Sequence, residues 1–269
     1  LYAASSEGYD KIVQMLLKHG ADANAKGGYY GNALQAASSG GHSEIVQMLL
    51  AHRANVNTHG GYYGNALYAA SFRGHDKIAQ MLLEHRADAN AKGGHYGNAL
   101  QAASSGGHGK IIQRLLEHGA NANAQGGYYG NALYAASSGG YDKIVQMLLE
   151  HGANASAQGG EYGNALQAAS SGGYDKIVQM LLKHGADANA KGGYYGNALQ
   201  AASSGGHYKV VHMLLENSAD VNAQGGVYGN ALRAASFEGH DKIVQMLHAA
   251  NLPAKRTPCD FPSKRSKIS

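Results

Sequence analysis

The tetrapeptide Gly-Asn-Ala-Leu recurs every 33 residues along the chain. Its copies start at Gly31, Gly64, Gly97, Gly130, Gly163, Gly196 and Gly229, with no insertion between any two of them. Residues 1–34 differ from residues 166–199 only at Tyr2/Gln167 and Glu7/Gly172, and Leu1 aligns with the last residue of an eighth copy. A fixed period of this length is typical of architectures in which identical small units stack on one another.

Each unit predicts two helices and a loop. In the second unit, Asn32 is suited to cap a short helix of small residues over 33–39, because its side-chain oxygen can accept from a free backbone N–H. A second helix is predicted over 43–52, where apolar residues recur at i, i+3 and i+4. The glycine-rich stretch that follows predicts a tight turn into the next unit.

Glycine ends the second helix in several units, as expected for a residue in the left-handed conformation. Arg53, Arg86 and Ser218 take its place in three units, at a cost of about 1 kcal/mol each if φ stays positive. One unit cannot bury its own apolar stripe, so stacking must do it. The last unit has His248 where the others have leucine, which predicts a polar C-terminal cap.

The units resemble ankyrin repeats. The resemblance rests on the run Asn-Ala-Leu-Gln-Ala-Ala-Ser-Ser-Gly-Gly-His, on Ile-Val-Gln-Met-Leu-Leu and on His-Gly-Ala-Asp-Ala-Asn-Ala, and it covers residues 1–250. It implies an all-α solenoid of eight helix-turn-helix units with hairpin-like turns, the first one truncated. The usual Thr-Pro-Leu-His motif reads Asn-Ala-Leu-Gln or Asn-Ala-Leu-Tyr here. Asn can still cap the helix, and Gln or Tyr can replace the missing bonds between units.

The variant Tyr-Gly-Asn-Ala-Leu-Gln-Ala-Ala is similar to repeats at the C-terminal end of fungal intracellular receptors, which also carry a nucleotide-binding NACHT domain. This resemblance implies the ligand-recognition region of a larger intracellular signalling receptor, with a protein as its partner. A passive scaffold or spacer is the alternative. The chain starts at Leu1, and all seven methionines fall at one repeat position, so we expect further domains upstream.

The net charge of +4 lies in the last segment. Residues 1–250 carry 17 basic and 17 acidic side chains, and this balance argues against nucleic acid as the partner. Residues 251–269 hold all three prolines and five basic residues, which predicts a disordered tail. The single cysteine, Cys259, fits a reducing compartment, and we expect a cytoplasmic protein, with nuclear import through the basic tail as the second location. No apolar run is long enough to span a membrane.

No residue pattern in the chain predicts catalysis, a cofactor, a metal or a small-molecule substrate. The most regular histidines are His19, His52, His85, His118, His151 and His184, one in each of the first six units. Packed units lie roughly 8–10 Å apart, whereas zinc needs nitrogens at about 2.0–2.1 Å. The serines recur in every unit with no unique histidine and aspartate beside one of them. We therefore expect a binding protein and not an enzyme.

Positions that differ between units are candidates for recognition, because packing does not fix them. The turn contributes Tyr29, Tyr62, His95, Tyr128, Glu161, Tyr194 and Val227. The end of the first helix contributes Glu7, Phe72, Arg73, Phe237 and Glu238, and the position where ankyrin repeats usually carry His contributes Tyr68, Tyr134 and Arg233. The resemblance implies that turn tips and first helices line one concave surface.

Two further expectations concern aromatic residues on this surface. Phe72 and Phe237 are expected to be exposed, and a large apolar group in solvent favours a binding role. The constant series Tyr30, Tyr63, Tyr129 and Tyr195 is expected to stack on neighbouring turns.

Overall fold

The computed structural model describes residues 1–251, and the predicted tail with Cys259 lies outside them except for Asn251, which is helical. Within this range sixteen helices follow one another, with isolated bridges but no strand. The first helices of the repeats are α1 (Tyr2–Glu7), α3 (Ala33–Gly40), α5 (Ala66–Arg73), α7 (Ala99–Ser105), α9 (Ala132–Ser138), α11 (Ala165–Ser171), α13 (Ala198–Ser204) and α15 (Ala231–Phe237). The second helices are α2 (Asp10–Lys18), α4 (Ser43–Ala51), α6 (Asp76–Glu84), α8 (Gly109–Glu117), α10 (Asp142–Glu150), α12 (Asp175–Lys183), α14 (Tyr208–Glu216) and α16 (Asp241–Asn251).

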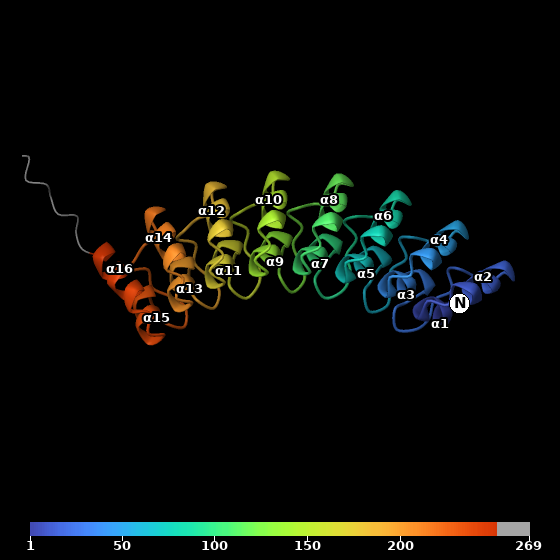
Figure 1. Ribbon diagram of the computed structural model, residues 1–269, viewed down its shortest axis with the longest axis horizontal. Coiled ribbons are helices and arrows are strands. Elements are labelled where there is room, and N and C mark those ends of the chain that lie inside the picture. The colour runs from blue at the N-terminus through green and yellow to red at the C-terminus, as the bar shows by residue number, and fades with distance from the viewer. Residues whose placement is uncertain (252–269) are drawn as a thin grey trace, which may run out of the picture.

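The eight repeats stand side by side along a shallow arc (Figure 1). The second helices lie on the outer side of this arc, and the glycine-rich turns lie on its inner side. The predicted all-α solenoid of eight helix-turn-helix units is confirmed, and the predicted helix ends differ from the observed ones by a single residue.

The predicted helix ends have the expected local chemistry. Asn32 Oδ1 accepts a hydrogen bond of 2.8 Å from Gln35 N, and the equivalent asparagine caps every later first helix in the same way. In seven repeats a residue of positive φ follows the second helix, directly after its C-cap. These include Arg53, Arg86 and Ser218, at φ 61°, 64° and 62°. Side chains with a Cβ are therefore held in the left-handed region, where glycine is favoured.

The core forms between repeats, as stacking requires. Ile45, Val46 and Leu49 of α4 are completely buried, and one hydrophobic cluster continues through all repeats, although Ile12, the equivalent of Ile45 in the first repeat, is exposed. His248 is exposed in α16, and its capping role stays a prediction. None of the helices in residues 1–251 is both long enough and apolar enough to cross a membrane.

Side-chain hydrogen bonds also join one repeat to the next. Asn24 Nδ2 donates to the Arg53 carbonyl at 3.1 Å, and Asn24 Oδ1 accepts from Asn55 N at 2.7 Å. His42 Nε2 bonds the Ser6 carbonyl at 3.1 Å, a contact that reaches back 36 residues. These bonds repeat along the array and hold the first helices and loops in register.

The histidines at the ends of the second helices bond their own helix. His19 Nδ1 lies 2.8 Å from the Met15 carbonyl, and the other five make the same contact. Each of these imidazole rings therefore already bonds a backbone carbonyl of its own helix. In residues 1–251 no group of three or more His, Cys, Asp or Glu side chains is placed to hold a metal ion.

Candidate partner-binding surface

The turns display two rows of side chains on the inner side of the arc. The tip row comprises Tyr29, Tyr62, His95, Tyr128, Glu161, Tyr194 and Val227, and all seven are exposed. The inner row comprises Tyr30, Tyr63, Tyr96, Tyr129, Tyr162, Tyr195 and Tyr228. Tyr29 is 61 % exposed and Tyr194 48 %, so even the least exposed tyrosine of the tip row offers about half of its surface. The predicted turn residues thus share one solvent-facing edge.

The inner row is a structural stack. Tyr30 and Tyr63 lie parallel with ring centroids 5.8 Å apart, and Tyr96 and Tyr129 are 5.4 Å apart. Tyr195 stacks on Tyr162 and on Tyr228. Stacked aromatic pairs stabilise their arrangement by about 0.5–1.5 kcal/mol beyond the burial of their area. The predicted stacking of the constant tyrosines is confirmed.

The prediction that Tyr68 and Tyr134 face a partner is wrong, because both side chains are only 2 % exposed. Each phenol lies under the turn of the next repeat and accepts a hydrogen bond from its backbone. Tyr68 accepts from Tyr96 N, and Tyr134 from Tyr162 N, both at 3.0 Å. Burial raises the pKa of the Tyr134 hydroxyl to about 12, although the bond from Tyr162 N–H lowers it.

Glutamine occupies the same position in other repeats and bonds the next turn with the opposite polarity. Gln35 Nε2 donates to the carbonyls of Thr58, Gly60 and Gly64 at 3.1, 3.0 and 3.2 Å. Gln101 repeats this pattern, while Gln167 and Gln200 each bond a single carbonyl. We call this the bridge position, and its members are Tyr2, Gln35, Tyr68, Gln101, Tyr134, Gln167, Gln200 and Arg233. Gln and Tyr therefore do make the bridges expected from the sequence.

At its first glycine the turn adopts two conformations, which follow the bridge residue of the preceding repeat. After glutamine, the first turn glycine has φ between 136° and 149°, at Gly60, Gly126, Gly192 and Gly225. After tyrosine, the equivalent Gly27, Gly93 and Gly159 lie outside the left-handed region. The reason is chemical: tyrosine offers an acceptor that needs a backbone N–H, whereas the glutamine amide N–H₂ needs backbone carbonyls.

The chain contains its own comparison for this effect. Turns 26–31 and 191–196 have the same sequence, yet they adopt different conformations. The repeats that precede them differ only at the bridge position and at Glu7/Gly172, a position at the exposed end of the helix. Turn 26–31 has no described turn before it, but turns 92–97 and 158–163 have one and also follow tyrosine. The bridge residue therefore sets the conformation of the following turn.

The two conformations divide the edge into three segments. After glutamine, the tip residue donates its backbone N–H to the preceding tip, as Tyr62 does to Tyr29 and Tyr128 to His95. The side chains follow, because Tyr29 stacks on Tyr62 at 4.9 Å. Tyrosine at the bridge position interrupts this pairing. The segments are turns 26–64, turns 92–130 and turns 158–229, separated at Tyr68 and Tyr134. In the sequence, the sole sign of this division is the change between Tyr and Gln.

Phe72 is half-buried, so the prediction that it is exposed is wrong. Its ring lies between Tyr63 and Tyr96, at centroid distances of 5.8 and 5.4 Å, and stacks on Tyr68. It fills the first boundary between segments. Arg73 remains exposed and lies over this cluster, with its Nε donating to Tyr63 Oη at 3.1 Å.

Comparison with known proteins agrees with the repeat architecture. A family model described as ankyrin repeats, in three copies, matches residues 1–93, 94–159 and 166–257. This chain belongs to the ankyrin repeat family. Its structure is similar to the crystal structure of the human ASB11 ankyrin repeat domain, with a TM-score of 0.71 and 25 % sequence identity. The match covers 82 % of this chain and 98 % of that one. No curated protein sequence matches the chain.

The last ankyrin repeat exposes the remaining predicted residues. Phe237 is 79 % exposed, as expected, and its ring lies 5.8 Å from that of Tyr228. Tyr228 donates to Glu238 Oε1 at 2.6 Å, and Arg233 is exposed at the bridge position, where the described chain has no following turn. Glu7 is exposed at the end of α1. Of the predicted set, only Tyr68, Tyr134 and Phe72 are withdrawn from solvent.

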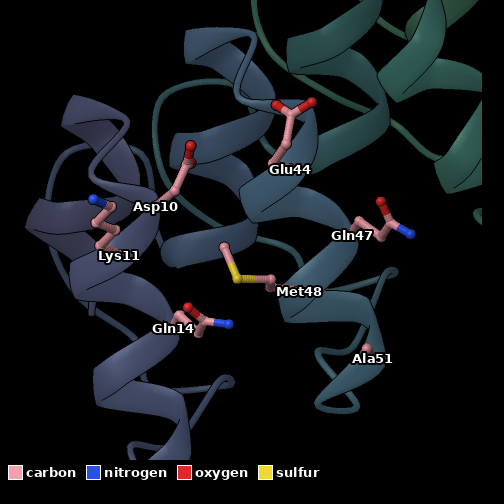
Figure 2. Close-up of a pocket in the computed structure, with 7 residues that line it drawn as sticks. All are labelled: Asp10, Lys11, Gln14, Glu44, Gln47, Met48 and Ala51. Carbon is pink, nitrogen blue, oxygen red and sulfur yellow. The ribbon is translucent and has the colours of Figure 1, made fainter.

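The outer side of the ankyrin array carries shallow grooves between second helices. The groove between α2 and α4 has a volume of about 470 Å³, and Met48 projects into it (Figure 2). Its polar lining comprises Asp10, Lys11, Gln14, Glu44 and Gln47, all of them exposed. A small-molecule site usually has a few enclosed polar groups that fix orientation. The groove in Figure 2 has none of these.

Proposed function

We propose that this ankyrin array binds a protein partner through its inner edge, with the tip row and Phe237 as the main contacts. Ankyrin repeats are generally protein–protein interaction modules. The observation that carries the proposal is the variation of the tip row. Its residues change from Tyr to His, Glu and Val between repeats whose buried residues hardly change.

The chemistry of the tip row suits recognition of a protein. Tyrosine offers a large contact area with both apolar and polar parts, and it loses little side-chain entropy on binding. Glycines flank each tip, so a partner can approach the backbone closely. Residues 1–250 carry equal numbers of acidic and basic side chains, which disfavours nucleic acid.

A combined variant tests the inner edge. Partners are captured with the wild-type chain, identified and purified, and their affinity for Tyr62→Ser/Tyr128→Ser/Tyr194→Ser/Phe237→Ser is then measured. We expect binding to weaken by at least about tenfold, since exposed aromatic anchors at interfaces often contribute 2 kcal/mol or more. The matched control changes four exposed outer positions, in Gln14→Ser/Gln47→Ser/Gln113→Ser/Gln179→Ser, and should bind as the wild type does.

Equal binding by both variants, at equal melting temperature, would contradict binding through the inner edge. It would favour the alternative that the array is a passive scaffold or spacer.

We also propose that the array is the ligand-recognition region of a larger intracellular signalling receptor, located in the cytoplasm. The support is the similarity of its Tyr-Gly-Asn-Ala-Leu-Gln-Ala-Ala units to the repeats of fungal NACHT-type receptors. The test is the reading frame upstream of Leu1. A nucleotide-binding domain encoded there would support the proposal, whereas a different kind of domain would contradict it.

A further inference from the structure

The two boundaries between segments of the inner edge share the hydrogen bonds of their bridge tyrosine and capping asparagine. They differ at the second turn glycine: Gly94 N donates to the Tyr63 carbonyl at 3.0 Å at the first boundary, whereas the equivalent Gly160 has φ 64° at the second. At each one a bridge tyrosine accepts from the following turn, through Tyr96 N at the first and Tyr162 N at the second, both at 3.0 Å. Asn65 Nδ2 donates to the Lys92 carbonyl at 3.0 Å, and its second-boundary equivalent makes the same bond at 3.1 Å. The ring pairs before the two boundaries also have the same geometry. The centroids of Tyr63 and Tyr68 are 6.1 Å apart with an interplanar angle of 36°, and those of Tyr129 and Tyr134 are 6.0 Å apart with an angle of 37°.

The boundaries differ in what lies between the two inner-row rings. At the first, the Phe72 ring bridges Tyr63 and Tyr96, and the Arg73 guanidinium lies 5.9 Å from the Tyr63 centroid. At the second, the equivalent residues are Ser138 and Gly139.

The aromatic contacts of the two boundaries differ accordingly. Among the aromatic contacts of residues 1–251, none joins Tyr129 to Tyr162, whereas Phe72 joins their first-boundary equivalents. Tyr63, which contacts Phe72 and Arg73, is only 3 % exposed, while Tyr129 is half-buried. The second boundary therefore lacks the aromatic group that completes the first.

The charge at the second boundary indicates a second feature of the missing group. Glu161, next to Tyr162, is exposed and is the only carboxylate of the tip row. At the first boundary the chain supplies its own cation beside the phenyl ring, as Arg73. Gly139 supplies no cation. The Glu161 carboxylate and the half-buried Tyr129 ring can therefore both interact with a cation that a partner supplies.

We propose that the second boundary, formed by Tyr129, Ser138 and Tyr162, receives an aromatic side chain of a partner protein with a basic residue beside it. This rests on the proposed function and names the chemistry of the partner at one place on that edge. The aromatic ring occupies the position that Phe72 fills at the first boundary, and the basic residue pairs with Glu161. The proposed pair of side chains corresponds to Phe72 and Arg73, which the chain itself supplies at the first boundary.

The probe for this site is the dipeptide N-acetyl-Phe-Arg-amide, with N-acetyl-Ala-Arg-amide as its control. Binding is followed by NMR through the ring signals of Tyr129 and Tyr162 in the full chain. We expect concentration-dependent shifts with the first dipeptide and none with the second. Equal shifts with both dipeptides, or none with the first at tens of millimolar, would overturn the proposal.

Two reciprocal substitutions locate the site. Ser138→Phe places in the chain the ring that Phe72 supplies at the first boundary, and it should weaken the dipeptide at least about tenfold. Phe72→Ser should open the first boundary and produce new shifts at Tyr63 and Tyr96. Each variant is compared with the wild type by melting temperature. Unchanged binding by a folded Ser138→Phe variant contradicts the proposal, and so does a folded Phe72→Ser variant without new shifts.

Failure of this inference differs from failure of the proposed function. A purified partner that binds Ser138→Phe normally but not the tip-row variant would leave the inner edge as the binding surface and remove only the aromatic site. A partner that still binds the tip-row variant would remove both.

Discussion

At the scale of single residues, a few side chains carry consequences that their type alone does not show. Arg53, Arg86 and Ser218 have positive φ because they stand where other repeats have glycine. Tyr134 is buried although tyrosine is the exposed residue of the tip row. The sequence predicted the first of these from the repeat register. It could not predict the second, since a residue that varies between repeats can vary for reasons of packing as well as recognition.

Glycine at the three left-handed positions should stabilise the array. Arg53→Gly, Arg86→Gly and Ser218→Gly each remove the steric cost of a Cβ at φ near 60°, so we expect a gain of about 1 kcal/mol apiece in the free energy of unfolding. Denaturant unfolding measures it. The control Arg53→Ala keeps the Cβ and should give no gain. An equal gain in that control would show that the arginine side chain and not the backbone is responsible.

Alkaline pH should destabilise the fold through the bridge tyrosines. Burial raises the pKa of Tyr134 to about 12 and also raises that of Tyr68 above its ordinary value of 10. The unfolded chain therefore loses these protons at lower pH than the folded chain, and stability falls as pH rises from about 10 to about 12. Denaturant unfolding over this range measures the fall. Tyr134→Phe should reduce the dependence on pH, and an unchanged dependence would contradict the assignment.

At the scale of the turn, one bridge residue controls the conformation of the next repeat. The glutamine side chain donates to the turn carbonyls and the tyrosine hydroxyl accepts from a turn N–H, so the two require different orientations of the glycine peptides. From the sequence, the helices, the asparagine caps and the stacked tyrosines were all predictable, because each depends on local pattern or fixed period. The division into segments was not, because it depends on hydrogen-bond polarity across 28 residues.

Exchanging the bridge residue should convert one turn into the other. In Tyr134→Gln we expect Gly159 to take φ near the 139° of Gly192, and Glu161 N to bond the Tyr128 carbonyl. A crystal structure of the variant tests this directly. Gln101→Tyr is the reverse exchange, and it should break the bond from Tyr128 N to the His95 carbonyl. Turns that keep their original conformation in both variants would show that another residue decides.

At the scale of the whole molecule, the array consists of similar repeats whose hydrophobic core lies between neighbours. Its acidic and basic side chains balance. Residues 1–250 have 17 side chains of each sign, and among the described residues one ion pair forms, between Lys77 and Glu44, beside a contact of His212 with Glu216; both are exposed. Exposed pairs of this kind contribute little to stability. Partner binding should therefore depend on contact area and not on long-range attraction.

Salt should barely change partner binding by the array. We expect the affinity to change by less than about threefold between 50 mM and 500 mM salt, because residues 1–250 carry no net charge and a single exposed pair with Glu161 contributes little. The measurement is made on the full chain and on a chain ending at residue 251, which lacks the basic segment. A steep loss with salt in the shorter chain would contradict the neutral-surface argument.

The bridge position has a consequence for how such genes change. Nearly identical repeats are readily duplicated, deleted or exchanged in units of 33 residues. Because a bridge residue acts on the turn after its own, inserting one unit remodels its downstream neighbour while leaving that neighbour's coding sequence untouched. Shuffling a small set of interchangeable modules can thus create new shapes without any new amino acid at the altered place.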